Sequence, residues 1–84
     1  MSQPYGDLVE TIAQVRFTPV RLHEGYDMAD VDALLDAVVA ALGRGERVEP
    51  LLDGARLTHV RLREGYRISE VDDFLEQVRR SAQA

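Results

Sequence analysis

The sequence predicts a mainly α protein: two tandem loop–helix repeats form a pseudo-two-fold helical pair, with a short helical turn before each. The segment from Arg16 to Val38 recurs as Arg56 to Val78, and twelve of the 23 aligned positions are identical. Each copy ends in apolar residues spaced three and four apart, a pattern typical of a helix with one buried stripe. Each copy is also near the size, about 40 residues, below which a domain rarely folds alone. We therefore expect a single domain over 1–84, with repeat one at 5–43 and repeat two at 46–82.

The chain opens with a segment that predicts a short amphipathic helix, from Tyr5 to Gln14. Leu8, Val9 and Ile12 lie on one helical face, and Pro4 stands where a helix start tolerates proline.

An extended segment follows over residues 15–24. Pro19 is disfavoured in a central strand, so we expect an extended loop or a short edge strand here. Gly25 and Tyr26 then form a structural turn, where we expect either a positive φ at the glycine or a tight backbone contact. Tyr26 is expected to pack against the start of the next helix with its hydroxyl near the surface.

The first long helix is predicted over residues 28–42. Asp27, followed three residues later by Asp30, resembles an N-cap with an acidic partner. Gly43 stands at the C′ position that ends many helices. The expected core seam of this helix consists of Met28, Val31, Leu35, Val38 and Leu42.

The second repeat predicts the same elements. Residues 50–53 read as one helical turn, residues 57–64 as the extended loop, and Gly65 and Tyr66 as the structural turn. The long helix is expected over 68–82, starting one or two residues later than in repeat one because Ser69 and Asp72 resemble a capping box. Its expected core seam consists of Ile68, Val71, Leu75, Val78 and Ala82.

The composition argues against several classes of function. The chain has no cysteine, and His23 and His59 occupy non-equivalent repeat positions, so we expect no metal site, no cofactor and no catalytic site. A net charge of −5 argues against nucleic-acid binding, because a phosphate backbone rewards basic surfaces. No apolar run is long enough for a membrane span. We predict a non-enzymatic protein.

The repeated motif resembles the N-terminal domain of DivIVA, a bacterial pole and septum scaffold, in its actinobacterial form. The residues that carry the resemblance are Phe17, Gly25-Tyr26-Asp27, Val31-Asp32, Leu34-Leu35, and, in the second copy, Gly65-Tyr66, Glu70-Val71-Asp72 and Phe74-Leu75. The resemblance implies that two copies cross their loops, run their helices in parallel and touch the membrane with the loop tips. It also implies an interaction or adaptor module in cell division, polar growth or septum organisation. The implied location is the cytoplasm, at the division site or pole on the inner face of the membrane.

The loop tips depart from that family. DivIVA has an apolar and a basic residue directly before Gly-Tyr, where this chain has His23-Glu24 and Arg63-Glu64. An acidic residue is unfavourable beside anionic lipid. The nearest substitutes, and our candidate membrane or partner contacts, are Arg21, Leu22, Arg61 and Leu62. Arg21 with Glu24, and Arg61 with Glu64, are also spaced for ion pairs within each loop.

Three functions remain open. The favoured one is an adaptor that binds a protein partner of unknown identity; the alternatives are a peripheral membrane binder that uses the loop tips, and a small-ligand domain. Because one chain carries both copies, we favour a monomeric pseudo-dimer over a homodimer. The apolar flanks Leu34 and Phe74 favour the homodimer if they remain exposed.

Overall fold

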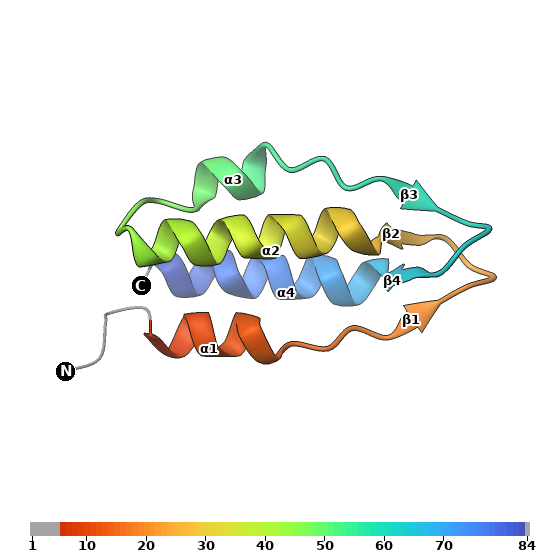
Figure 1. Cartoon of the computed structure of the whole chain (residues 1–84), viewed down its shortest axis with the longest axis horizontal. Helices are drawn as coiled ribbons and strands as arrows, with labels where there is room; N and C mark the ends of the chain where they lie inside the picture. The colour runs from red at the N-terminus through yellow and green to blue at the C-terminus, as the bar shows by residue number, and fades with distance from the viewer. Residues whose placement is uncertain (1–5, 84) are drawn as a thin grey trace.

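The computed structural model describes residues 6–83 and shows an α+β fold. Four helices fill one part of an elongated molecule of 45 × 23 × 18 Å, and a small antiparallel sheet lies at the other end (Figure 1). The elements are α1 (Gly6–Gln14), β1 (Pro19–Val20), β2 (Gly25–Asp27), α2 (Met28–Gly43), α3 (Glu49–Asp53), β3 (His59–Val60), β4 (Gly65–Arg67) and α4 (Ile68–Gln83).

The sheet makes the mainly α prediction wrong. The four strands are antiparallel in the order β1-β4-β2-β3, and each is only two or three residues long. Each of the three strand pairs joins one repeat to the other: β1 to β4, β4 to β2, and β2 to β3. Pairing of this kind leaves no periodicity within either segment, so the sequence of one repeat does not reveal it.

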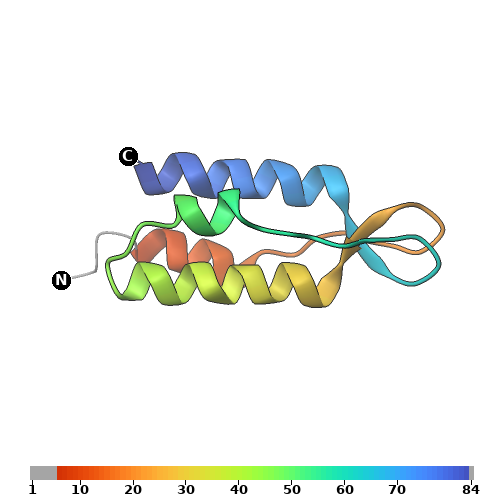
Figure 2. The same cartoon turned by 90° about the horizontal axis from the view of Figure 1, so that it is seen from above.

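The two loops therefore cross. In the central pair, Tyr26 lies opposite Tyr66, and Gly25 and Gly65 lie on either side of this position. At the ends of β2 and β4, the backbone N–H of Asp27 donates to the Thr58 carbonyl oxygen at 2.8 Å, and the N–H of Arg67 donates to the Thr18 carbonyl oxygen at 3.0 Å. Both loop tips project beyond the crossing at the same end of the molecule (Figure 2).

The four helices form a bundle, in which the two short preceding helices pack against the expected helical pair. The long helices α2 and α4 run in the same direction, while α1 and α3 run back along them (Figures 1 and 2). Each long helix contacts both short ones. The short preceding helices are therefore part of the core: Leu8 and Ile12 of α1 are buried, and Val48 before α3 is 1% exposed.

The helix ends follow the predictions in part. Asp27 is the N-cap of α2, and its carboxylate accepts from the Ala29 N–H at 3.3 Å. The C′ residue is Gly45 instead of Gly43: it has a φ of 72°, and the N–H of Glu46 donates back to the Ala41 carbonyl. Helix α4 begins at Ile68, the equivalent of Met28, and not later. The expected start of α1 at Pro4 and Tyr5 lies outside the described residues.

Eight of the ten predicted core seam residues belong to the core of the bundle or pack against it; Met28 and Ile68, at the starts of α2 and α4, do not. The valines at the centre, Val31 and Val38 of α2 with Val71 and Val78 of α4, are fully buried. Leu35 and Leu42 are also buried, whereas Met28, Ile68, Leu75 and Ala82 are half-buried. The flanks that could have favoured a homodimer are covered within the chain. Phe74 is 8% exposed and packs edge-on against Phe17, and Leu34 is half-buried against the core.

Candidate interaction site at the loop tips

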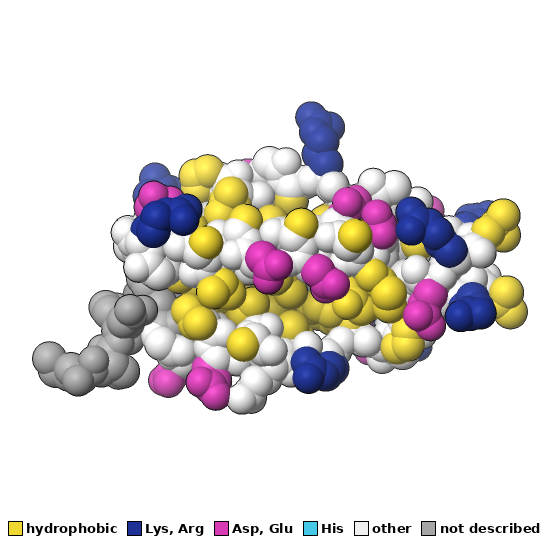
Figure 3. Space-filling model, viewed as in Figure 1, with side chains coloured by type: hydrophobic (Ala, Val, Ile, Leu, Met, Phe, Trp, Pro, Cys, Tyr) yellow, Lys and Arg dark blue, Asp and Glu magenta, His cyan; other side chains and the backbone are white. Residues whose placement is uncertain are grey.

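The tips carry the largest exposed apolar side chains of the described residues. Leu22 is 86% exposed and Leu62 is 95% exposed. Both lie in bends between strands that the crossed sheet directs to one end, where hydrophobic and basic side chains gather side by side (Figure 3). Leucine side chains are normally removed from water, so two of them at one end indicate a contact surface.

The charges around the leucines are mostly free. Arg21 and Arg61 make no hydrogen bond or ion pair with any residue in the range 6–83. Arg63 lies 3.5 Å from the Asp27 carboxylate, a weak contact across the two repeats. The two tips hold three arginines and two glutamates, so they are slightly basic within a chain whose net charge is −5.

The expected ion pairs within each loop do not form. The Glu24 carboxylate lies 3.0 Å from Nδ1 of His59, which belongs to the other repeat. Glu64 makes no ion pair with any described residue. Arg21 and Arg61 are therefore available to an external partner. Glu24 instead contacts His59 of the other repeat.

Two glycines allow the loops to cross. Neither Gly25 nor Gly65 has a positive φ; the backbone contact is what requires them. A Cβ on Gly25 would lie 2.8 Å from the Tyr66 carbonyl oxygen, and one on Gly65 would lie 2.7 Å from that of Tyr26. The glycines thus permit the two strands to pass within backbone contact, which sets the direction of both tips.

The tyrosines next to these glycines connect each loop to the other repeat's helix. The Tyr26 hydroxyl donates to Asp72 of α4 at 2.7 Å, and the Tyr66 hydroxyl donates to Asp32 of α2 at 3.0 Å. Burial, reinforced by the Asp72 carboxylate, raises the pKa of Tyr26 to about 12. Burial and Asp32 raise the pKa of Tyr66 in the same way.

A second pair of contacts also joins the helix of each repeat to the loop of the other repeat. Asp30 of α2 accepts the Thr58 N–H at 2.9 Å. Its equivalent in α4, Glu70, accepts both the N–H and the hydroxyl of Thr18, at 2.6 and 2.9 Å. These hydrogen bonds lower the pKa of both carboxyl groups. The N-terminus of each long helix therefore binds the loop of the other repeat, and these contacts position the loop tips.

The predicted contact residues Arg21, Leu22, Arg61 and Leu62 lie together at the tips, and the fold brings Arg63, which the prediction did not include, to the same end. Gly25, Tyr26, Gly65 and Tyr66 lie at the crossing itself. Within residues 6–83, no group of three or more histidine and acidic side chains could hold a metal ion.

No protein-family model, no curated protein and no solved structure matches this chain. The DivIVA resemblance therefore continues to rest on the repeated motif and remains a prediction.

Proposed function

We propose that the chain is a non-enzymatic, DivIVA-like interaction module that acts as an adaptor in cell division, polar growth or septum organisation. The observation that carries the proposal is the crossed pair of loops, which presents Leu22 and Leu62 to solvent at one end. The resemblance implies crossed loops and parallel helices, and both features are present here within one chain. This architecture supports a role in positioning a contact surface.

A cytoplasmic position at the division site or pole, on the inner face of the membrane, belongs to this proposal. Among the described helices, none is long and apolar enough to cross a membrane. We also propose that the working unit is a monomeric pseudo-dimer, because the chain supplies both halves of every strand pair. Light scattering at a single-chain mass over a wide dilution range is the expected result, and a constant dimer mass would contradict it.

The second candidate function is peripheral membrane binding, and the exposed leucines beside free arginines favour it. Insertion of the two leucines would contribute about 1.5–3 kcal/mol each. Each arginine near an anionic surface would add about 1 kcal/mol. Glu64, which makes no ion pair with any described residue, opposes this attraction. A contact of this size is reversible and weakens with salt.

A photo-crosslinking experiment separates the two candidates. Benzoylphenylalanine at position 22 or 62 is introduced into the full chain in its native cytoplasm, and the adducts are identified by mass spectrometry. One recurring protein adduct is expected for the adaptor, and lipid adducts for the membrane binder. The matched control carries the same residue at Arg80, an exposed position on α4 away from the tips. Adducts of the same identity and yield from the tips and from position 80 would overturn both candidates.

Binding to vesicles gives an independent measurement. The Leu22→Ser/Leu62→Ser double variant is compared with wild type on phosphatidylcholine vesicles with and without phosphatidylglycerol. Membrane binding predicts co-sedimentation of wild type that requires the anionic lipid, falls with salt and is lost in the variant. Wild-type co-sedimentation that is indifferent to salt and to both substitutions would refute membrane binding by the tips.

A further inference from the structure

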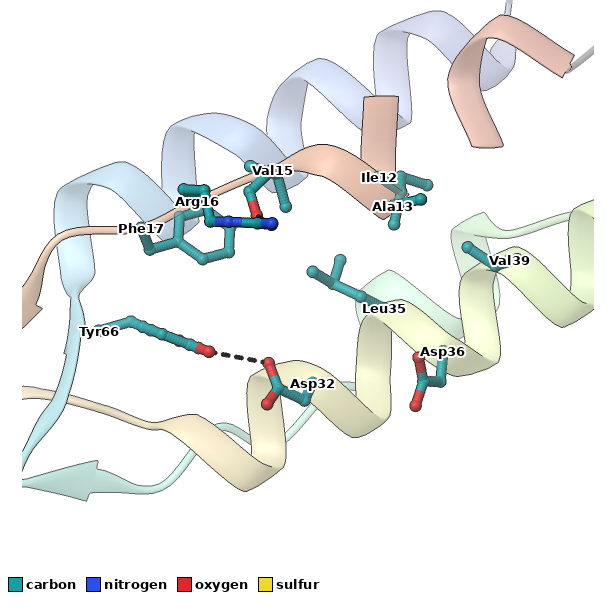
Figure 4. Close-up of a pocket in the computed structure, with 10 residues that line it drawn as sticks. All are labelled: Ile12, Ala13, Val15, Arg16, Phe17, Asp32, Leu35, Asp36, Val39 and Tyr66. Carbon is teal, nitrogen blue, oxygen red and sulfur yellow. Dashed lines mark hydrogen bonds between the residues drawn. The ribbon is translucent and has the colours of Figure 1, made fainter. Parts of the chain in front are cut away.

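An open groove of about 680 Å³, lined by apolar and charged side chains, lies between α1 and α2, away from the tips. Ile12 and Leu35 form its floor, and Tyr66 lies at the end nearer the sheet, where it bonds to Asp32 (Figure 4). Hydrophobic side chains line the hollow between the two helices on the surface of the molecule (Figure 3). Val39 and Val15 are only half-buried, so part of this apolar surface remains in contact with water.

The second repeat contains a smaller counterpart groove, between α3 and α4, and this groove is closed at the end where Arg79 lies. An offset of 40 residues superposes the two repeats, and at the position of Val39 the second repeat has Arg79. The Arg79 guanidinium donates to the carboxylate of Asp53, which stands at the position of Ala13. It also lies 3.9 Å from Glu76, at the position of Asp36. The space left in this counterpart is about 320 Å³.

Of the three charged residues in this cluster, the open groove has an equivalent only for Glu76. Ala13 and Val39 replace the two residues whose charges close the counterpart, and Asp36 alone retains its carboxylate. Asp36 makes no hydrogen bond or ion pair with any residue that the structure describes. At this place the first groove therefore has the apolar side chains of Ala13 and Val39 beside the Asp36 carboxylate, which pairs with no described residue. The second groove has the aliphatic stem and guanidinium of Arg79 at the same place.

We infer that this groove binds a partner protein through a short segment that carries a basic side chain flanked by apolar residues. The basic group would occupy the place that Arg79 holds in the counterpart, next to Asp36, and its aliphatic stem would cover Val39 and Ala13. The charge of the groove fits this occupant, because its lining carries Asp32 and Asp36 against Arg16. This inference rests on the proposed role as an interaction module, and it places a protein partner on a surface distinct from the tips.

Arg16 limits what the segment can be. It lines the end of the groove nearer the sheet, and its guanidinium donates only to the carbonyl oxygens of Gln14 and Val15. The Asp32 carboxylate lies at the same end and offsets the charge of Arg16, so this end has no net charge to attract a basic group. The groove therefore favours a segment whose basic residue lies at the Asp36 end, which gives the bound segment a direction.

The test uses a display library of random 16-residue peptides, selected on the full chain and counter-selected on the Ala13→Asp/Val39→Arg double variant. This variant rebuilds the ion pair that closes the second groove. Enriched peptides are expected to contain arginine or lysine beside two or more apolar residues. Their affinity, measured by fluorescence anisotropy, should fall by at least about tenfold on the closed variant, as expected for a blocked pocket. Circular dichroism checks that the variant is folded.

Asp36→Asn provides a second variant that removes only an exposed charge. It should weaken the enriched peptides by about twofold to fivefold, the range expected for an exposed ion pair. The matched control, Glu76→Gln at the equivalent position of the closed groove, should leave binding unchanged. The inference is overturned if no peptide is enriched over the counter-selection, if the enriched peptides lack basic residues, or if they bind Asp36→Asn as well as wild type. Peptides lost only in the Leu22→Ser/Leu62→Ser variant would also overturn it while supporting the tips as the contact site.

Discussion

Substitution of either crossing glycine by alanine should destabilise the whole protein. On Gly65, a methyl carbon would lie 2.7 Å from the Tyr26 carbonyl oxygen and 2.7 Å from Cγ2 of Val60. Carbon atoms attract best at about 3.5–4.0 Å, so the second contact is roughly 0.8 Å too short. The valine can rotate, but the carbonyl belongs to the central strand pair and can yield only if β2 and β4 separate.

The size of the effect follows from two opposing contributions. Forcing a methyl group into a packed site costs about 1–3 kcal/mol. Alanine restricts the unfolded chain more than glycine does, which returns about 0.4–1 kcal/mol. Taking the middle of each range, we expect Gly25→Ala and Gly65→Ala each to lower the free energy of unfolding by roughly 1.3 kcal/mol. Because both methyl groups push on the same crossing, the double variant should lose less than the sum of the single losses.

The assay is urea unfolding followed by circular dichroism at 222 nm, with the m-value checked for constancy. Gly43→Ala is the matched control. An alanine Cβ there meets nothing within 4 Å, and the residue lies in the last turn of α2. That substitution should be neutral or stabilising by up to about 1 kcal/mol. Urea midpoints of the Gly25 and Gly65 variants that coincide with wild type would refute the reasoning.

Three further predictions concern the core, pH and the exchange between repeats. Phe74→Ala should lower the free energy of unfolding by about 3–5 kcal/mol, and Leu75→Ala, which is only half-buried, by less; equal urea midpoints for the two variants would contradict this order. Asp30 has a lowered pKa, so its stabilising effect is present above its ordinary value of 3.8 and is lost as pH falls through the lower folded value. The stability difference between wild type and Asp30→Asn should therefore shrink on acidification below about pH 4, and a difference that stays constant with pH would exclude this contribution. Fragments 1–45 and 46–84 should each show little helix alone and gain it when mixed, because every strand pair joins them; a well-folded, monomeric single fragment would disprove that dependence.

The helices and the edge strand at Pro19–Val20 could be predicted from the sequence, but the pairing of the strands into one sheet could not. Residues 28–42 and 68–82 carry a buried stripe every three or four positions, and this local signal is sufficient for a helix. The strands are two or three residues long and pair only with the other repeat, so their hydrogen bonds depend on a crossing that no single segment encodes. Gly45 illustrates the same limit at smaller scale, because two glycines flank Arg44 and only the backbone geometry shows which one ends the helix.

Some of the candidate contact residues could likewise be predicted from the sequence, and others could not. Leu22 and Leu62 could be proposed from the repeated motif, since both copies place the same residue four positions before their tyrosine. Arg63 was missed because it has no counterpart in the first loop, where His23 stands. The open groove also went unnoticed, although a signal for it is present: the repeats differ at Ala13 and Asp53, and again at Val39 and Arg79.

These differences are the consequence of joining two repeats in one chain. In a homodimer every substitution appears twice, so a groove closed on one side is closed on the other, and both tips carry the same charge. Here Arg79 closes one groove while Val39 leaves the other open, and Arg63 makes the second tip more basic than the first. The residues that hold the crossing, by contrast, are the same in both halves: Gly25 with Gly65, and Tyr26 with Tyr66. The crossing requires symmetry because each half supports the other, whereas the outer surfaces are free to differ between the two halves.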